Sequence, residues 1–222
     1  MAKRRNVSVK MNAVLNVIKT ISSIVFPLIT FPYISRVLTV ESIGAYNFGV
    51  SIVNYFILLA GLGISTYAIR EGTQYRDDNK KMEKFSSEIF TINMISTIVA
   101  YILLVCCVLF VPKIHSYAVI IIVLGIEILF TTLGVNWLCN IYEDFLYITL
   151  RTIAFQTISL LALFIFVKET QDLLKYIIIV VFASSGANLL NFFYIRKRYV
   201  KFGLVSSITK HIKPIMIIPP FS

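Results

Sequence analysis

The chain has 222 residues, of which 58% are hydrophobic and 14% are charged, and its mean hydropathy is +0.83. Soluble domains carry about 25% charged residues, so this composition excludes an ordinary water-soluble fold. The net charge of +10 fits basic loops that stay in the cytoplasm, because the Lys and Arg clusters lie between apolar runs. We therefore expect an integral membrane protein that has no nucleic acid as a partner.

Six apolar segments of membrane-spanning length follow one another along the chain. Each has about 20 residues or slightly more, which is enough to cross a hydrocarbon core of ~30 Å as an α-helix. None shows the alternation of polar and apolar residues that is typical of strands in a membrane barrel. The sequence therefore predicts an all-α integral membrane protein, a bundle of six transmembrane helices. The segments lie at about residues 12–35, 44–66, 87–111, 117–140, 146–167 and 174–195.

The distribution of Lys and Arg predicts how these spans are oriented. Sixteen of the 21 basic residues fall on the side that holds both ends of the chain, and four fall on the other side. By the positive-inside rule, both termini are then cytoplasmic. The expected organisation is a basic cytoplasmic N-terminus (1–11), a six-helix transmembrane lobe (12–199), and a cytoplasmic linker with the truncated start of a seventh span (200–222).

The first span is unusual because it contains Lys19, Pro27 and Pro32. A charge at the centre of a membrane helix costs about 2.5–3.5 kcal/mol, so Lys19 is a candidate functional residue. Each proline removes an amide donor and favours a bend, which membranes tolerate only where protein or a wet cavity satisfies the freed carbonyls. We expect the span to bend and line a cavity in which Lys19 meets an anion. The alternative is that the Lys19 side chain extends to the lipid headgroups.

Other polar residues within the spans are also candidates. Glu127 lies in the middle of the fourth span. Three roles are open for it: a partner of Lys19, an interhelical hydrogen-bond donor or an ion-coupling group. Asn47 and Asn54 lie about two turns apart on one face of the second span, where they either contact substrate or join helices. Further positions are expected to join, pack or end helices: Asn136, Asn188, Asn191, Gly61 and Gly63.

The sequence contains no catalytic constellation. It has no phosphate-binding glycine loop, no metal-ligand cluster and no nucleophile–base spacing, so we expect no metal, no cofactor and no enzymatic activity. The three cysteines lie within apolar runs, which argues against a disulfide framework. The acidic pair Glu143 and Asp144 could hold a metal in a membrane glycosyltransferase, but a solvated loop between the fourth and fifth spans is the simpler interpretation.

Four stretches carry a family resemblance through their order and their spacing relative to the spans. They are "FPLITFPYISRVLTVESIGAYNFGVSIVNYF" (26–56), "GLGISTYAIREGTQYRDD" (61–78), "NWLCNIYEDFLYITLRTI" (136–153) and "NLLNFFYIRKRY" (188–199). Together they resemble the Wzx-type polysaccharide repeat-unit flippases of the MOP exporter superfamily, over about residues 12–215. Thr39 departs from the family pattern, which favours glycine or a small residue there, and Ala68 stands where glycine is common. Members have two such bundles, so the chain resembles an N-terminal half.

This resemblance implies a function. The family moves a polyprenyl-diphosphate-linked oligosaccharide, for O-antigen, capsule or exopolysaccharide, across the bacterial cytoplasmic membrane. Expected partners are that substrate, membrane lipids, and the polysaccharide polymerase with its chain-length machinery. The site residues implied are substrate contacts at Lys19, Arg151, Asn47 and Asn54, gate or headgroup contacts at Arg36 and Arg70, and ion coupling at Glu127.

Three other functions remain open at the level of sequence. A multidrug exporter of the related MATE branch would share the bundle but would favour acidic cavity residues for cationic drugs. A membrane glycosyltransferase would depend on Glu143 or Asp144. A non-transporting remnant would enter the membrane but would not restore export in a strain that lacks its own flippase.

Overall fold

The computed structural model describes residues 9–205, 210–211 and 214–215. Most of the predicted basic N-terminus (1–11) therefore lies outside the described residues, as do 206–209, 212–213 and 216–222 of the predicted linker and seventh span. The described part is helical and contains no strand. Its elements are α1 (Val9–Val37), α2 (Val40–Gly61), α3 (Ile64–Gly72), the 3-10 helix η1 (Thr73–Tyr75), α4 (Asn79–Phe110), α5 (Pro112–His115), α6 (Ala118–Leu133), α7 (Asn136–Ile141), α8 (Phe145–Phe166) and α9 (Leu173–Arg198).

Six stretches of the described chain are long and apolar enough to cross a membrane, which confirms the predicted all-α bundle of six spans. Four of them are single helices, whereas Val40–Tyr75 combines α2, α3 and η1, and Ala118–Ile141 combines α6 and α7. α4 begins well before its apolar run, because the Asp78 side chain caps its first turn by accepting a hydrogen bond from the Lys81 amide at 3.1 Å.

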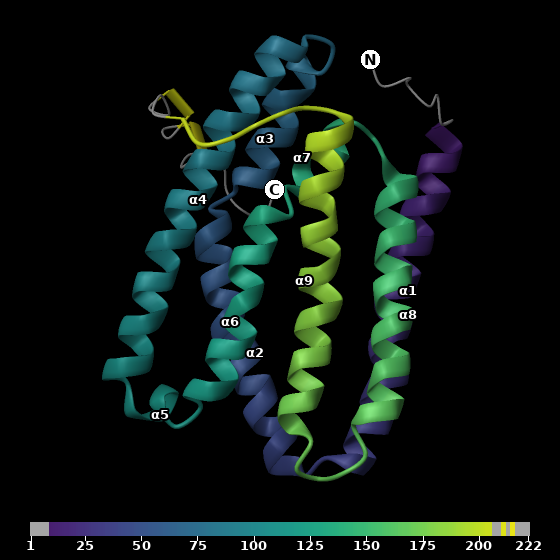
Figure 1. Cartoon of the computed structure of the whole chain (residues 1–222), viewed down its shortest axis with the longest axis vertical. Helices are drawn as coiled ribbons and strands as arrows, with labels where there is room; N and C mark the ends of the chain where they lie inside the picture. Colours follow the sequence, from purple (N-terminus) through teal and green to yellow (C-terminus); the bar gives the residue numbers. More distant parts are fainter. Residues whose placement is uncertain (1–8, 206–209, 212–213, 216–222) are drawn as a thin grey trace.

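The long helices run side by side in a single bundle (Figure 1). α1 packs along α8, α9 lies against both α8 and α6, and α2 packs on α4 and α6. α3, α7 and the first turns of α4 lie at the same end of the bundle as the start of α1 (Figure 1). In its most apolar window, only 11% of α1 is buried, against 44% for α6 and α7. α1 is therefore a peripheral helix of the described chain, with broad apolar faces left exposed.

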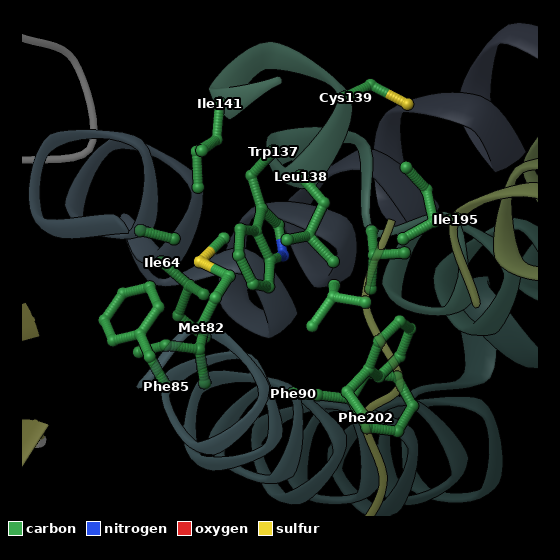
Figure 2. Close-up of a cluster of buried hydrophobic side chains, with 14 of the residues drawn as sticks. Ile64, Met82, Phe85, Phe90, Trp137, Leu138, Cys139, Ile141, Ile195 and Phe202 are labelled. Carbon is green, nitrogen blue, oxygen red and sulfur yellow. The ribbon is translucent and has the colours of Figure 1, made fainter. Parts of the chain in front are cut away.

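The largest cluster of buried side chains lies where α3, α4, α7 and the end of α9 meet. Figure 2 shows Trp137 and Leu138 projecting from α7 into this cluster, towards Met82 of α4. All three are at least 97% buried, with exposed fractions of 3%, 0% and 0%. The short helix α7 is thus held by its side chains, since six residues are too few to form a stable helix alone.

Two of the spans are interrupted, and neither contains a proline at the interruption. Between α2 and α3, Leu62 and Gly63 adopt left-handed backbone angles with φ of 38° and 71°. Between α6 and α7, Val135 has φ 38°, a conformation that a β-branched residue rarely adopts. α3 packs directly on α7, so the two breaks are neighbours. α2 ends at Gly61, as predicted, whereas the other interruption was not predicted.

α1 is one uninterrupted helix that includes both Pro27 and Pro32. The sequence placed a backbone irregularity there, and the described chain instead places its interruptions in the second and fourth spans. A smooth bend of α1 at the two prolines stays a prediction.

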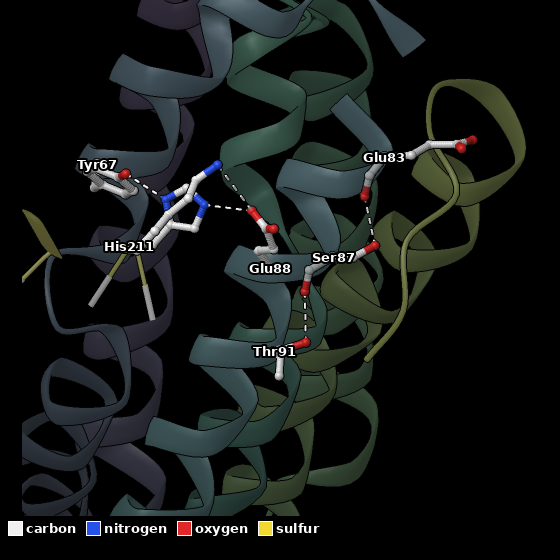
Figure 3. Close-up of polar contacts among 7 residues, drawn as sticks. Tyr67, Glu83, Ser87, Glu88, Thr91 and His211 are labelled. Carbon is white, nitrogen blue, oxygen red and sulfur yellow. Dashed lines mark hydrogen bonds and ion pairs between the residues drawn. The ribbon is translucent and has the colours of Figure 1, made fainter. Parts of the chain in front are cut away.

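The segment after α9 folds back over the end of the bundle and docks on α3 and α4 (Figure 1). His211 bridges two buried side chains, with its Nδ1 2.7 Å from the Tyr67 hydroxyl and its Nε2 2.7 Å from Glu88 Oε2. Lys210 adds a more distant ion pair to the same carboxylate at 3.8 Å (Figure 3). This segment is therefore attached to α3 and α4 by polar side chains.

Candidate anion site and polar cavity

Arg151 is a buried cation without an anionic partner in the described part of the chain. It lies in the first half of α8, 9% exposed, and its guanidinium centre is 5.5 Å from the centroid of the Tyr147 ring. One nitrogen, Nη2, donates to Asn136 Oδ1 at 3.0 Å. The other two, Nε and Nη1, are buried and have no partner among the described residues. Burying an unpaired charge is unfavourable, so Arg151 is a candidate for binding an anion.

Lys19 brings a second positive charge to the same place. It is half-buried on α1 and lies close enough to Arg151 for the two like charges to interact. Hydrogen bonds on both sides of Lys19 hold α1 against α8, from Thr149 Oγ1 to the Leu15 carbonyl at 3.1 Å and from Ser22 Oγ to Gln156 Oε1 at 2.5 Å. Two cations from different helices thus lie within electrostatic range of each other, and such a pair can bind a multiply charged anion.

Three asparagines orient Arg151. Asn136 Nδ2 donates to Asn188 Oδ1 at 3.0 Å, and Asn191 Nδ2 donates to Asn136 Oδ1 at 3.4 Å as well as to the carbonyl of Gly134. Gly134 must be a glycine because a Cβ there would lie 2.7 to 3.0 Å from the side chain of Asn188. The expectation that these asparagines join helices is confirmed, and Asn136 also fixes the position of the guanidinium.

A cavity of about 80 Å³ lies between the two helix breaks. Its walls come from the end of α2, the start of α3, the junction of α6 with α7, and Asn93 of α4. Two buried atoms of lining residues have no partner among the described residues, Oδ1 of Asn93 and Nε1 of Trp137. Asn136 lines the cavity and also accepts the hydrogen bond from Arg151, so this residue is common to the cavity and the cationic site.

The other candidate residues lie elsewhere on the described chain. Asn47 and Asn54 are exposed on α2, and the Ser51 hydroxyl between them donates to the Asn47 carbonyl at 2.8 Å. Arg36 is exposed in the last turn of α1, roughly 25 Å along the helix from Lys19. Of the predicted substrate contacts, the structure brings together only Lys19 and Arg151.

Arg70 and Glu127 also lie apart from the cationic pair. Arg70 forms an exposed ion pair with its neighbour Glu71 at 3.6 Å. Glu127 accepts a hydrogen bond from Ser184 of α9 at 2.6 Å, and no ion pair joins it to Lys19 in the described structure. This contact supports the expected role of Glu127 in an interhelical hydrogen bond. In the structure Glu127 is the acceptor of that bond, whereas the sequence analysis considered it as the donor.

Glu143 and Asp144 are occupied by structural contacts. Arg76 Nη1 donates to Glu143 Oε1 at 2.8 Å. Asp144 caps α8 and accepts hydrogen bonds from the hydroxyls of Tyr194 and Tyr199 at 2.5 and 2.7 Å. Burial, together with the bond to Asp144, raises the pKa of Tyr199 to about 12, so this hydroxyl remains a donor at neutral pH. The contacts give no support to a metal-holding pair.

Asn93 and Trp137 are site residues that the sequence reasoning missed. Asn93 is a single amide within a long apolar run, and Trp137 is the only tryptophan of the chain. Those two facts were the available signals, but neither indicates that the two side chains line the same cavity.

The six apolar spans define a multi-pass membrane protein, and the cation Arg151 is buried within it. Residues 9–218 match the family model described as "Polysaccharide biosynthesis protein", and the chain belongs to that family. It is 27% identical over 168 residues to the "Putative O-antigen transporter" of Escherichia coli strain K12. The predicted resemblance to Wzx-type flippases is thereby confirmed. The match covers 76% of this chain and 40% of that relative, so the chain spans less than half the relative's length. No solved structure matches the chain.

Proposed function

We propose that this chain forms one bundle of an exporter that moves a polyprenyl-diphosphate-linked oligosaccharide across the bacterial cytoplasmic membrane. Membership of the polysaccharide biosynthesis family and the similarity to an O-antigen transporter support this class of function. The observation that carries the proposal is the buried Arg151 with two unpartnered guanidinium nitrogens beside Lys19. In this proposal the protein carries its substrate without changing it chemically and is not an enzyme.

The physical task is to take a diphosphate through an apolar layer. A bare diphosphate in hydrocarbon would lose its hydration without compensation. A guanidinium has a planar fork of donors that matches two phosphate oxygens, and an ammonium adds a compact second charge. In this proposal Arg151 and Lys19 bind the diphosphate, while the lipid tail remains in the bilayer alongside the exposed apolar faces of the helices.

The remaining residues have secondary roles in the proposal. Asn47 and Asn54 face the carried sugars from α2, Glu127 takes part in ion coupling, and Arg36 and Arg70 act at the two membrane surfaces as gates or headgroup contacts. Both chain ends face the cytoplasm, and a second bundle closes the cavity. Rocking of the bundles then exposes the site to each side in turn. The polysaccharide polymerase and its chain-length machinery receive the product on the far side.

The test is a complementation assay in a strain that lacks its own flippase, using a transporter that contains this sequence together with a second bundle. Lys19→Ala and Arg151→Ala should each lower surface polysaccharide about ten- to a hundredfold, the cost of a lost charge-assisted hydrogen bond. Arg151→Lys should give an intermediate level because it keeps the charge without the planar fork.

The matched control is Lys168→Ala, an exposed cation in the loop between α8 and α9, which should leave export unchanged. Normal surface polymer from the Lys19 and Arg151 variants, at normal protein levels, would eliminate the diphosphate-contact role. The described chain expressed without a second bundle should insert in the membrane but fail to complement, and full complementation would contradict the two-bundle arrangement.

A further inference from the structure

Three titratable side chains from different parts of the chain meet where the segment after α9 docks. Tyr67 of α3, Glu88 of α4 and His211 of that segment are 5%, 2% and 3% exposed. Figure 3 shows His211 between the other two, with Nδ1 2.7 Å from the Tyr67 hydroxyl and Nε2 2.7 Å from Glu88 Oε2. Neither the cationic site nor the cavity includes these residues, so the cluster is a separate feature of the bundle.

This cluster can keep both of its hydrogen bonds in two protonation states of the imidazole. When His211 is neutral, Nε2–H donates to Glu88 and Nδ1 accepts from the Tyr67 hydroxyl. When a second proton is bound, Nδ1–H donates to the hydroxyl oxygen, which is also an acceptor. The hydroxyl hydrogen turns, and the heavy atoms can stay at the same distances. The charge changes, because the contact between Glu88 and His211 becomes an ion pair.

The charge nearest to His211 in the described part of the chain is negative. It is the Glu88 carboxylate of α4, at hydrogen-bond distance. From the segment after α9, Lys210 lies 3.8 Å from the same carboxylate oxygen, but its side chain is 66% exposed, so water screens its charge. On α3, Arg70 and Glu71 pair with each other at 3.6 Å, and their opposite charges largely offset one another. The buried carboxylate is therefore the dominant charge beside the imidazole.

Two other hydrogen bonds that hold the segment after α9 on α4 join neutral groups. The Gly203 amide donates to Ser87 Oγ at 3.3 Å, and the Val205 amide donates to Thr91 Oγ1 at 3.0 Å. Neither bond involves an ionisable group, so their strength changes little with pH. The contact of His211 with Glu88 is thus the attachment that a proton can strengthen or weaken.

From these features we infer that Glu88, His211 and Tyr67 form a proton-binding site that controls how firmly the segment after α9 docks on α3 and α4. A proton taken up from water by Nδ1 of the imidazole creates the ion pair with Glu88 and strengthens docking. Its return to water removes the ion pair and weakens docking. Since α3 begins at the first helix break, the bound proton also restrains that break. The inference stands on these contacts and does not depend on the diphosphate role proposed for Arg151.

Hydrogen exchange of the Gly203 and Val205 amides measures docking, because both amides donate to α4 only while the segment is docked. The full chain in lipid nanodiscs is followed by mass spectrometry at about pH 6 and pH 8, a range in which an imidazole changes charge and exposed carboxylates do not. Each rate is divided by the intrinsic exchange rate at the same pH, so the ratio reports docking. The protection of these amides should be about tenfold greater at the lower pH.

Two variants test whether the cluster is the proton site. His211→Gln keeps a donor for Glu88 and an acceptor for Tyr67 but cannot take up a proton, so it should stay docked and lose the dependence on pH. Glu88→Gln removes the carboxylate and should lose the increase in protection at the lower pH. Glu83→Gln, which changes an exposed acid on the same helix, is the matched control and should keep the increase.

The outcomes decide the inference independently of the proposed function. Equal protection at both pH values in the parent chain would overturn it, as would an increase at the lower pH that persists in His211→Gln. An increase that is lost in both variants and kept in Glu83→Gln would establish the proton site. Should Glu88→Gln fail to fold, the comparison of His211→Gln with the parent still decides. Normal export by Arg151→Ala would eliminate the diphosphate contact and leave this inference unchanged.

Discussion

The first span and the two interrupted spans differ in the continuity of their helices, and the proline content of their sequences predicts the opposite difference. α1 contains two prolines and remains one helix, whereas the second and fourth spans break at Leu62–Gly63 and Val135 without a proline. Each break is accompanied by a side chain from another helix that binds a freed carbonyl. Ser96 of α4 donates to the Ala60 carbonyl at 2.5 Å, and Asn191 of α9 donates to the Gly134 carbonyl.

This difference shows that partners, more than prolines, decide where a membrane helix is interrupted. In a bilayer, an unsatisfied carbonyl costs several kcal/mol, so a break is stable only where protein or water receives it. α1 is peripheral and packs mainly on α8, and it offers little protein to receive such groups. The breaks therefore lie in the centre of the bundle, next to the cavity.

The largest effect is expected from removing the side chain that satisfies the second break. Asn191→Leu loses the bonds to Gly134 and to Cys139 Sγ and leaves a buried carbonyl unpaired, which should destabilise the bundle by about 1–3 kcal/mol. Reversible unfolding in mixed micelles measures it. Asn47→Leu, on the exposed face of α2, is the control and should change stability little. Equal effects of the two variants would contradict the role assigned to Asn191.

A steric change tests the same break from the other side. Gly134→Ala places a Cβ within 3.0 Å of the root of the Asn188 side chain, so α6 and α9 must separate, at a cost of about 1–2 kcal/mol. The same unfolding assay applies. Gly44→Ala is the matched variant, because a Cβ there meets nothing within 4 Å. A stable Gly134→Ala would show that the contact is not a tight constraint.

The first break should be less sensitive. Ser96→Ala removes one hydrogen bond to the Ala60 carbonyl, and the expected loss is about 1 kcal/mol. Ser23→Ala, which removes a local bond on the exposed face of α1, is the comparison and should be close to neutral. Loss of stability in Ser23→Ala but not in Ser96→Ala would reverse the conclusion about partners.

The prolines of α1 provide the converse test. Pro27→Ala and Pro32→Ala should not destabilise the bundle, because alanine restores an amide donor to a helix that is already continuous. If the predicted bend is used in transport, the same variants lower export without lowering stability. A clear loss of stability would mean that the prolines support the fold in a way their helix does not reveal.

The smallest effect lies far from the breaks, in the loop between α8 and α9. Asp172 accepts bonds from the Lys175 ammonium at 2.6 Å and from the amides of Lys168 and Glu169. These contacts lower its pKa from 3.8 to about 2. Because the folded-state pKa is depressed, this contribution to stability is present above pH 3.8 and is lost as the pH falls through about 2. Asp172→Asn should therefore differ from the parent at neutral pH and converge with it at the acid end.

The hydropathy of the sequence was sufficient to predict the spans, and Gly61 and Gly63 indicated where α2 ends, but nothing in the sequence predicted the interruption at Val135. α8 begins and ends within one residue of its predicted bounds, because an apolar run bounded by polar residues specifies a membrane helix locally. The breaks depend on Ser96 and Asn191, which reach them from other helices. Local sequence contains no record of that contact, and Val135 has no turn chemistry of its own.

Only part of the candidate site was predicted, because contacts between helices leave no trace in the local sequence. Lys19 was identified because charges are rare within membrane helices, and Arg151 was implied by the family resemblance. Their proximity follows from the packing of α1 on α8, which no short pattern specifies. Trp137 and Asn93 resemble ordinary members of apolar runs, and only the folded chain shows that they share a cavity.

The docking of the segment after α9 has a mechanical consequence. Backbone amides of Gly203 and Val205 donate to Ser87 and Thr91 of α4, and His211 joins Glu88 of the same helix to Tyr67 of α3. A force applied to this segment therefore reaches α4 and α3 directly. Since α3 begins at the first break, a force on this segment would act on the residues that border the cavity before it acted on α1 or α8.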